Sequence, residues 1–249
     1  MSGHSKWNTI KHKKGATDAK RGKIFTLHAR MVALAARSGG DPAMNPALRT
    51  AIDRAKADNV PNDNIDRAIK KGTGEDKDGA QIEEITYEAF GPEGSSFLID
   101  VITDNKNRSL TNIRTLLTKN GGNMGAAGTV AWKFDKKAYL LVDAAGKNPD
   151  DVELELIDAG ADDLEKVDDK FELTVSLEKW GEVKKKVEAA GYKIEKDEAV
   201  WVPKDPLPVT DPELAKKLVH LMELIEEDDD VNKVSSNVDF DESVLSALR

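Results

Sequence analysis

The stretch KFELTVSLEKWGEVKKKVEAAGYKIEKDEAVWV, residues 170–202, predicts a strand, a helix and a second strand in succession. Apolar and polar residues alternate between Phe171 and Ser176, which is the period of a half-buried strand. The apolar positions between Trp180 and Val187 recur at three- and four-residue spacing, as on one face of a helix. The last four residues are predominantly apolar and predict the closing strand.

The residues before this stretch complete a known order of elements. AYLLV, residues 138–142, predicts a strand, and Asn148–Pro149 opens a helix that ends near Gly160. A further short strand is predicted around Leu164–Val167. The full order is βαββαβ, that of a ferredoxin-like domain, and we expect this domain to cover residues 136–204.

A second α/β unit begins before this domain. Residues 84–89 alternate as a half-buried strand, and SFLIDVIT, residues 96–103, is apolar enough for a central strand. A helix is predicted at about residues 109–120, followed by a glycine-rich loop and a strand around Val130–Phe134. The unit therefore lacks a helix and a strand.

The end of the chain supplies such a pair. PKDPLPV, residues 203–209, predicts a stiff linker, after which Asp211 caps a helix and a strand follows around Val231–Val238. A lone helix and strand cannot bury a core of their own. We therefore expect a discontinuous middle domain made of residues 79–135 and 205–249, with the βαββαβ domain inserted in it.

The sequence predicts that the first 74 residues are helical. The first helix is capped at Thr17/Asp18 and ends at Gly39–Gly40, and the second starts at Asn45 with Pro46 in its first turn. The third is capped by Asn62 and stopped by Gly72. The buried positions expected in the first helix are Ile24, Leu27, Met31 and Leu34.

The expected fold class is therefore α+β. An N-terminal three-helix domain, residues 1–78, precedes two ferredoxin-like α/β domains, one inserted in the other. GTGEDKDG, residues 72–79, predicts the linker between the helical part and the rest.

Charge is distributed unevenly along the chain. The protein is acidic, with a net charge of −9, yet residues 1–74 contain fifteen Lys/Arg against six Asp/Glu, whereas residues 75–249 contain 22 against 40. Such an asymmetry indicates binding to nucleic acid or to a membrane surface. No run approaches the ~20 apolar residues of a membrane span, so nucleic acid is the expected partner. The acidic part would repel a polyanion, which confines the expected binding to one face.

The sequence offers little for catalysis or for cofactors. It has no cysteine, which excludes disulfides, cysteine-ligated zinc and thiol catalysis. None of the four histidines stands in a metal-binding motif, and the acidic run near Asp228 lacks the glycine of a calcium loop. We expect no enzyme activity, no cofactor, no metal and no small-molecule substrate. The expected compartment is the cytoplasm; a mitochondrial transit peptide is the less favoured reading of the basic opening.

The candidate nucleic-acid-binding residues are cations, with one aromatic side chain. Trp7 lies among lysines in the opening segment and is suited to stacking on a base. Lys23, Arg30 and Arg37 fall seven residues apart and form one stripe on the first helix. DNKNRS, residues 104–109, precedes a helix and offers a weaker phosphate site. The full set is His4, Lys6, Trp7, Lys11, His12, Lys13, Lys14, Lys20, Arg21, Lys23, Arg30, Arg37, Lys106 and Arg108.

The glycine-rich loop GGNMGAAGTV, residues 121–130, matches neither a dinucleotide-binding fingerprint nor a Walker loop. Its backbone amides could form a nest for a phosphate. A flexible turn is the favoured interpretation.

Four motifs resemble those of one family in the same order. GHSKWNTIKHKKGATDAKRGKIF, YEAFGPEG, DNKNRS and GGNMGAAGTVAW are similar to the YebC/PmpR family, and the similarity covers essentially the whole chain. The resemblance implies a helical N-terminal domain followed by two α/β domains. It also implies a non-enzymatic cytoplasmic regulator, which in some members looks like a DNA-binding transcriptional regulator and in others like a translation factor acting on the ribosome.

The residues discriminate only slightly between these two functions. A helix–turn–helix drawn across residues 46–71 would present Asp63 and Asp66 near the reading end of its second helix, where acids suit DNA poorly. A basic arm with Trp7 fits folded RNA at least as well. DNA and ribosomal RNA both remain open, and a protein-only adaptor is the third alternative.

Overall fold

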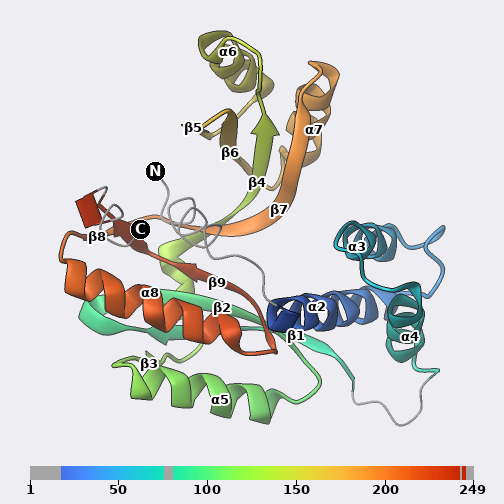
Figure 1. Cartoon of the computed structure of the whole chain (residues 1–249), viewed down its shortest axis with the longest axis vertical. Helices are drawn as coiled ribbons and strands as arrows, with labels where there is room; N and C mark the ends of the chain where they lie inside the picture. Colours follow the sequence, from blue (N-terminus) through green and yellow to red (C-terminus); the bar gives the residue numbers. More distant parts are fainter. Residues whose placement is uncertain (1–17, 76–80, 242, 245–249) are drawn as a thin grey trace.

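The computed structural model describes residues 18–75, 81–241 and 243–244, except for the side chains of residues 18–20. Its elements form three units, which we call the helical, middle and inserted units (Figure 1). In this view the inserted unit stands above the middle unit, and the helical unit lies to one side of the middle unit. The mixed α+β class is confirmed.

The inserted unit has the βαββαβ order that the sequence predicts. Its sheet has the strand order β5-β6-β4-β7, and all neighbouring strands are antiparallel. Leu140, Phe171 and Val183 lie in a core shared by the sheet and both helices. The elements are β4 (Phe134–Asp143), α6 (Pro149–Ala159), β5 (Asp163–Val167), β6 (Lys170–Ser176), α7 (Trp180–Ala189) and β7 (Lys193–Pro203).

The strand predicted at Val130–Phe134 is wrong. Residues Ala131–Lys133 form the 3-10 turn η2, and β4 begins only at Phe134, from which it runs without interruption to Asp143. The reason is that the backbone amides of Val130 and Ala131 donate to the carboxylate of Glu88. Amides bound in this way cannot also donate to a neighbouring strand.

The middle unit is assembled from both ends of the chain. Its sheet has the order β3-β1-β2-β9, and β9 pairs with β2 in antiparallel register. The segment after the inserted unit thus completes the sheet begun before it. The elements are β1 (Glu83–Phe90), the 3-10 turn η1 (Pro92–Gly94), β2 (Ser96–Thr103), α5 (Lys106–Lys119), β3 (Asn123–Met124), α8 (Pro212–Glu227) and β9 (Val231–Ser236). A separate parallel pair joins β8 (Leu207–Val209) to β10 (Val238–Phe240).

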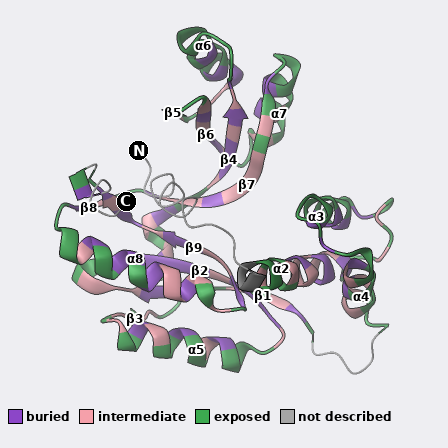
Figure 2. Ribbon diagram, in the orientation of Figure 1, coloured by how far each residue is buried: buried purple, intermediate pink, exposed green. Residues whose placement is uncertain are grey.

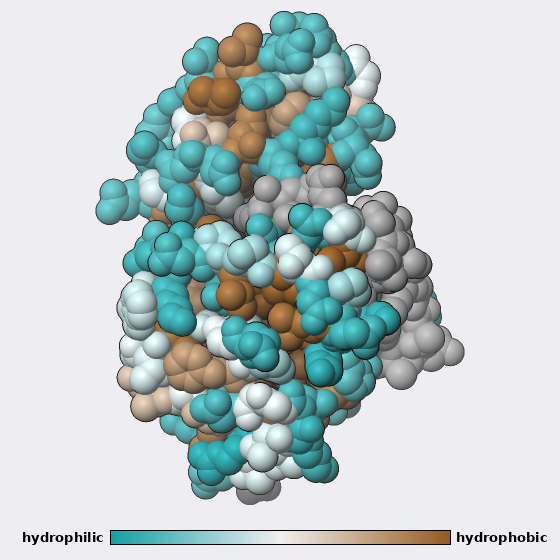
Figure 3. Space-filling view, turned by 90° about the vertical axis from the view of Figure 1, so that its left-hand side faces the viewer, coloured by the Kyte–Doolittle hydropathy of each residue, from teal (hydrophilic) through white to brown (hydrophobic). Residues whose placement is uncertain are grey.

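One core holds the middle unit together. Ile113 and Leu117 of α5, Leu218 and Ile225 of α8, and Ile99 of β2 all belong to it. Figure 2 shows the buried residues of α8 on the face turned toward the sheet. Figure 3, a view of the side that lies at the left in Figure 1, shows a mainly hydrophilic surface with hydrophobic side chains exposed over the upper part and the centre.

The helical unit consists of α2 (Asp18–Ala36), α3 (Pro46–Ala57) and α4 (Asn62–Thr73). The Asn45 side chain accepts the Leu48 amide at 3.0 Å and caps α3, which begins at Pro46, one residue after the predicted start. The predicted ends of α4 differ from the structure. Pro61 occupies the N-cap position, and the helix continues through Gly72 to a left-handed Gly74 with φ of 77°.

The buried face of α2 also differs from the prediction. Ile24 is exposed, and Leu27, Met31 and Leu34 are only half-buried, whereas Val32, Ala33 and Ala36 are fully buried. The small residues are buried because α4 approaches α2 closely along them. A Cβ on Gly72 would lie 2.2 Å from the carbonyl oxygen of Ala33. Close approach therefore decides the buried face, rather than the size of the apolar side chains.

Candidate nucleic-acid interface

The predicted binding residues divide into two groups. His4, Lys6, Trp7, Lys11, His12, Lys13 and Lys14 lie outside the described residues, as does the side chain of Lys20. Arg21 is exposed on α2. Arg21, Lys23, Arg30, Arg37, Lys106 and Arg108 are described, and the last five of these contact other parts of the chain.

Two cations of the predicted stripe bind the end of α8. Lys23 donates from Nζ to the carbonyl oxygen of Asp228 at 2.7 Å and also to the carbonyl oxygen of Glu226. Arg30 donates to the carbonyl oxygen of Asp229. A helix C-terminus has unpaired carbonyls and a partial negative charge, which cations stabilise. The helical unit thus supplies positive charge that the end of α8 lacks within its own last turn.

Arg30 also binds the centre of a buried ionic cluster. Its Nη2 lies 2.8 Å from Oδ1 of Asp230, whose side chain is only 3% exposed. Arg108 donates to both carboxylate oxygens of Asp230 at 2.9 Å, and the Ser109 hydroxyl donates at 2.6 Å. Burial alone would raise the pKa of Asp230, but the hydrogen bonds from Ser109 and Arg108 and the charge of Arg30 hold it below its ordinary value.

Further contacts join the helical and middle units. Arg37 donates to the carbonyl oxygen of Ile82 at 2.9 Å, and Lys71 of α4 lies 3.4 Å from Asp104. Lys106 does not bind the helical unit; it pairs with Glu83 at 2.5 Å. The structure brings Lys23, Arg30 and Arg108 together around one acidic corner, and it places Arg37 and Lys106 elsewhere. Binding of phosphate by this set stays a prediction.

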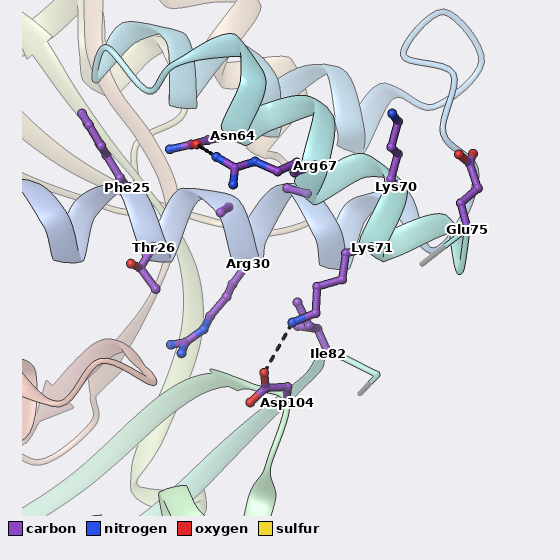
Figure 4. A pocket seen from close by; sticks show the side chains of 12 residues that line it. Phe25, Thr26, Arg30, Asn64, Arg67, Lys70, Lys71, Glu75, Ile82 and Asp104 are labelled. Carbon is purple, nitrogen blue, oxygen red and sulfur yellow. Dashed lines mark hydrogen bonds and ion pairs between the residues drawn. The ribbon is translucent and has the colours of Figure 1, made fainter. Parts of the chain in front are cut away.

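A basic groove lies between α2, α4 and the middle unit (Figure 4). It has a volume of about 690 Å³, and its apolar wall includes Phe25, Ala29 and Ala68. The cations along it are Arg30, Arg67, Lys70 and Lys71, and the acids are Glu75 and Asp104.

Three cations of this groove, Arg67, Lys70 and Lys71, are residues that sequence reasoning missed. Lys70 is exposed, and Arg67 is exposed with neutral acceptors: the side chain of Asn64 and, at 3.1 Å, the carbonyl oxygen of Asp63. Figure 4 shows Arg67 turned toward Asn64 and Lys71 turned toward Asp104. The signal was present as three cations within residues 67–71, near the end of the third helix.

The glycine-rich loop is a backbone nest with an internal ligand. The Glu88 carboxylate accepts the amides of Gly128, Val130 and Ala131, the last at 2.8 Å. Burial would raise the pKa of Glu88, yet these backbone hydrogen bonds lower it below the ordinary value. The loop therefore binds a carboxylate of its own chain with the amides that could otherwise form a nest for a phosphate.

His28 is buried on α2 and its Nε2 lies 2.5 Å from a carboxylate oxygen of Asp58. Among the described residues, no group of three or more His, Cys, Asp or Glu side chains is arranged to hold a metal ion. Within the same residues, no helix has the length and apolar character needed to cross a membrane.

Comparison with known proteins gives matches over the whole chain. A probable transcriptional regulatory protein of Maridesulfovibrio salexigens is 49% identical over 249 residues, covering 100% of this chain and 99% of that protein. A protein of the same description from Syntrophobacter fumaroxidans is 45% identical over 249 residues, with full coverage of both. The crystal structure of a conserved hypothetical protein from Aquifex aeolicus matches with a TM-score of 0.82 and 39% identity, over 94% of this chain and 96% of that one.

Two family models match adjacent parts of the chain. The TACO1/YebC N-terminal domain matches residues 5–75, and the TACO1/YebC second and third domain matches residues 82–238. The boundary between the two matches falls at the link between the helical and middle units. The chain therefore belongs to the TACO1/YebC family.

Proposed function

We propose that this protein is a nucleic-acid-binding regulator of gene expression with no catalytic activity of its own, and that its helical unit makes the main contact. The observation that carries the proposal is the groove between α2 and α4. Arg67 and Lys70 are exposed there beside apolar walls, within residues 1–74, which as a whole carry fifteen Lys/Arg against six Asp/Glu. Such cations bind the phosphates of a nucleic acid through their charge, and this binding needs no reactive group.

The names of the relatives support a regulatory role. The Maridesulfovibrio and Syntrophobacter proteins are described as probable transcriptional regulatory proteins. This points to DNA as the first candidate target. The basic opening segment, including Trp7 and its lysines, would extend the contact beyond the described residues.

Ribosomal RNA is the second candidate, and one observation favours it. The first turns of α4 present Asp63 and Asp66 to solvent, at the end that a recognition helix would direct into the major groove. Carboxylates there would be repelled by the phosphates on both sides of the groove. A groove that binds backbone and shape tolerates this arrangement better than one that reads base pairs.

The groove is tested with the full chain carrying Arg67→Gln and Lys70→Gln together. Purified ribosomes and a random-sequence DNA duplex serve as probes, and affinity is measured across a series of salt concentrations. The slope of log affinity against log salt should fall by up to about 0.9 per lost contact on the duplex, and by less on single strands. The matched control is Lys217→Gln on the exposed face of α8, which should leave affinity unchanged.

Crosslinking in cells, followed by sequencing of the bound DNA and RNA, separates the two targets. Enrichment of ribosomal RNA would select the translation role, and enrichment of defined DNA sites would select transcription. Wild-type affinity in the double variant for every probe would contradict the groove as the contact site.

A further inference from the structure

One tryptophan lies on the surface far along the chain from the helical unit. Trp132 of η2 is 61% exposed. Among the described residues, it is the one aromatic side chain in the group of exposed large hydrophobic residues. Its indole Nε1 donates to the carbonyl oxygen of Thr129 at 3.0 Å. The polar atom of the ring is therefore already satisfied, and what the ring offers to solvent is its apolar face. Tryptophan is enriched at interfaces, where a partner can bury the apolar ring.

The backbone that carries Trp132 is held in place on both sides. Before it, Glu88 binds the amides of Val130 and Ala131. After it, the Lys204 amide donates to the carbonyl oxygen of Lys133 at 2.8 Å, and Lys204 Nζ donates to the carbonyl oxygen of Trp132 at 3.0 Å. A ring presented on a fixed backbone loses little conformational freedom when it binds a partner.

Three lysines, Lys133, Lys136 and Lys204, lie at or next to the paired ends of β4 and β7 that follow Trp132, in an otherwise acidic part of the protein. The Lys133 ammonium lies 5.9 Å from the centroid of the Trp132 ring, and the Lys136 ammonium lies 5.2 Å from that of Trp201. Lys136 and Lys204 are exposed, and Lys204 pairs at 3.2 Å with Asp135. The local excess of positive charge contrasts with the 22 Lys/Arg against 40 Asp/Glu of residues 75–249 as a whole.

We propose that Trp132, Lys133, Lys136 and Lys204 form a second nucleic-acid contact, which we call the Trp132 platform. The Trp132 ring stacks on one unpaired nucleobase, and the lysines bind the phosphates on either side of it. Both features suit a single strand, because a planar base and a phosphate occur together in every nucleotide. A duplex hides its base faces, so the platform distinguishes single-stranded segments from duplex. The proposal rests on the proposed nucleic-acid binding and adds a site outside the helical unit.

The test measures binding of a fluorescently labelled single-stranded oligoadenylate RNA, and of the same RNA annealed to its complement, by anisotropy with the full chain. Trp132→Ala should weaken single-strand binding about 5- to 100-fold, which corresponds to the loss of one stacked base. Trp132→Phe should retain most of the affinity, because a ring remains. Binding of the duplex should change little.

Two further variants make the test specific. Leu154→Ala removes another exposed apolar side chain, 63% exposed on α6, and should have no effect. Lys136→Gln should reduce the salt slope for the single strand by about 0.7, the value for one phosphate contact. This second measurement decides the question even if Trp132→Ala lowers the thermal stability of the loop.

The outcomes that overturn the platform differ from those that overturn the proposed function. Two results would exclude the platform, provided that the wild-type protein binds the single strand. One is an unchanged affinity in Trp132→Ala, and the other is an unchanged salt slope in Lys136→Gln. Either result would leave the helical unit as the binding site. A wild-type protein that binds neither RNA, duplex DNA nor ribosomes would overturn both proposals.

Discussion

Arg30 of α2 and Asp230, the residue before β9, join the helical unit to the middle unit, with Nη2 2.8 Å from Oδ1. The contact links residues 200 positions apart. Asp230 is buried and also binds Arg108 and Ser109 of α5. One carboxylate therefore holds together α2, which is the first helix of the described residues, a helix of the middle unit and the start of the last strand of its sheet.

Removal of this carboxylate should destabilise the protein strongly. In Asp230→Ala, the guanidinium groups of Arg30 and Arg108 lose their shared partner while they stay partly buried, and the Ser109 hydroxyl loses one of its acceptors. Breaking a buried ion pair in this way costs about 3–5 kcal/mol. Urea unfolding measures the loss. Asp229→Ala is the matched control, because its side chain is exposed, and it should change the free energy of unfolding by less than about 0.5 kcal/mol.

The same carboxylate should make stability depend on pH. The pKa of Asp230 in the folded protein is held below its ordinary value of 3.8, so the charged form favours the folded state. This contribution is complete above the unfolded-state pKa and is lost as the pH falls through the folded-state pKa. The difference in unfolding free energy between wild type and Asp230→Asn should therefore shrink as the pH is lowered from about 6 to about 3. A difference that stays constant over this range would contradict the ionised cluster.

The hydrogen bonds from the glycine-rich loop to Glu88 should require both carboxylate oxygens of that side chain. Glu88→Gln replaces one acceptor oxygen by an amide NH₂. This NH₂ is a donor, so it cannot accept a hydrogen bond from the backbone amides that it faces. The variant should lose about 1–3 kcal/mol of stability, and the amides of Gly128, Val130 and Ala131 should exchange with solvent faster. Hydrogen exchange followed by NMR reports each amide separately. Glu84→Gln, on an exposed position of the same strand, should leave the exchange rates unchanged.

The local patterns of the sequence were sufficient for much of the fold. Alternation between Phe171 and Ser176 predicted the strand β6, and Pro46 in the first turn predicted the start of α3 to within one residue. Both signals involve neighbours in the chain. The isolated helix and strand after residue 209 also predicted the returning β9, because neither could bury a core alone.

The contacts that were missed join residues far apart in the chain. A stripe of cations looks the same whether its partners are phosphates or carbonyl groups, and nothing local shows that Lys23 faces the end of α8. In the same way, the amides of the glycine-rich loop gave no sign that Glu88, forty residues earlier, would bind them. The cations between Arg67 and Lys71 are visible in the sequence, but the basic excess of the opening segment is larger.

Lys23 and Arg37 allow phosphate binding to be separated from domain packing. The sequence predicts that each cation replaced by Gln lowers the salt slope on duplex DNA by up to about 0.9. The structure adds that Lys23 also loses hydrogen bonds to two backbone carbonyls and Arg37 loses one, each bond worth about 1 kcal/mol of stability. Both effects together are the expected result. Reduced stability with an unchanged slope would assign the two side chains to packing of the units alone.

Gly72 should be essential to the packing of α4 against α2. A Cβ at this position would lie 2.2 Å from the carbonyl oxygen of Ala33 and 2.7 Å from Cβ of Ala36, so Gly72→Ala must push the two helices apart. Overpacking of this kind costs about 1–3 kcal/mol, more than the gain in helix propensity returns. Gly22→Ala is the control in α2 itself: nothing lies within 4 Å of its Cβ, and alanine should stabilise the helix by about 0.8–1 kcal/mol. Thermal unfolding of both variants should therefore shift in opposite directions. A stabilising effect of Gly72→Ala would contradict the close approach of α2 and α4, and with it the geometry of the basic groove between them.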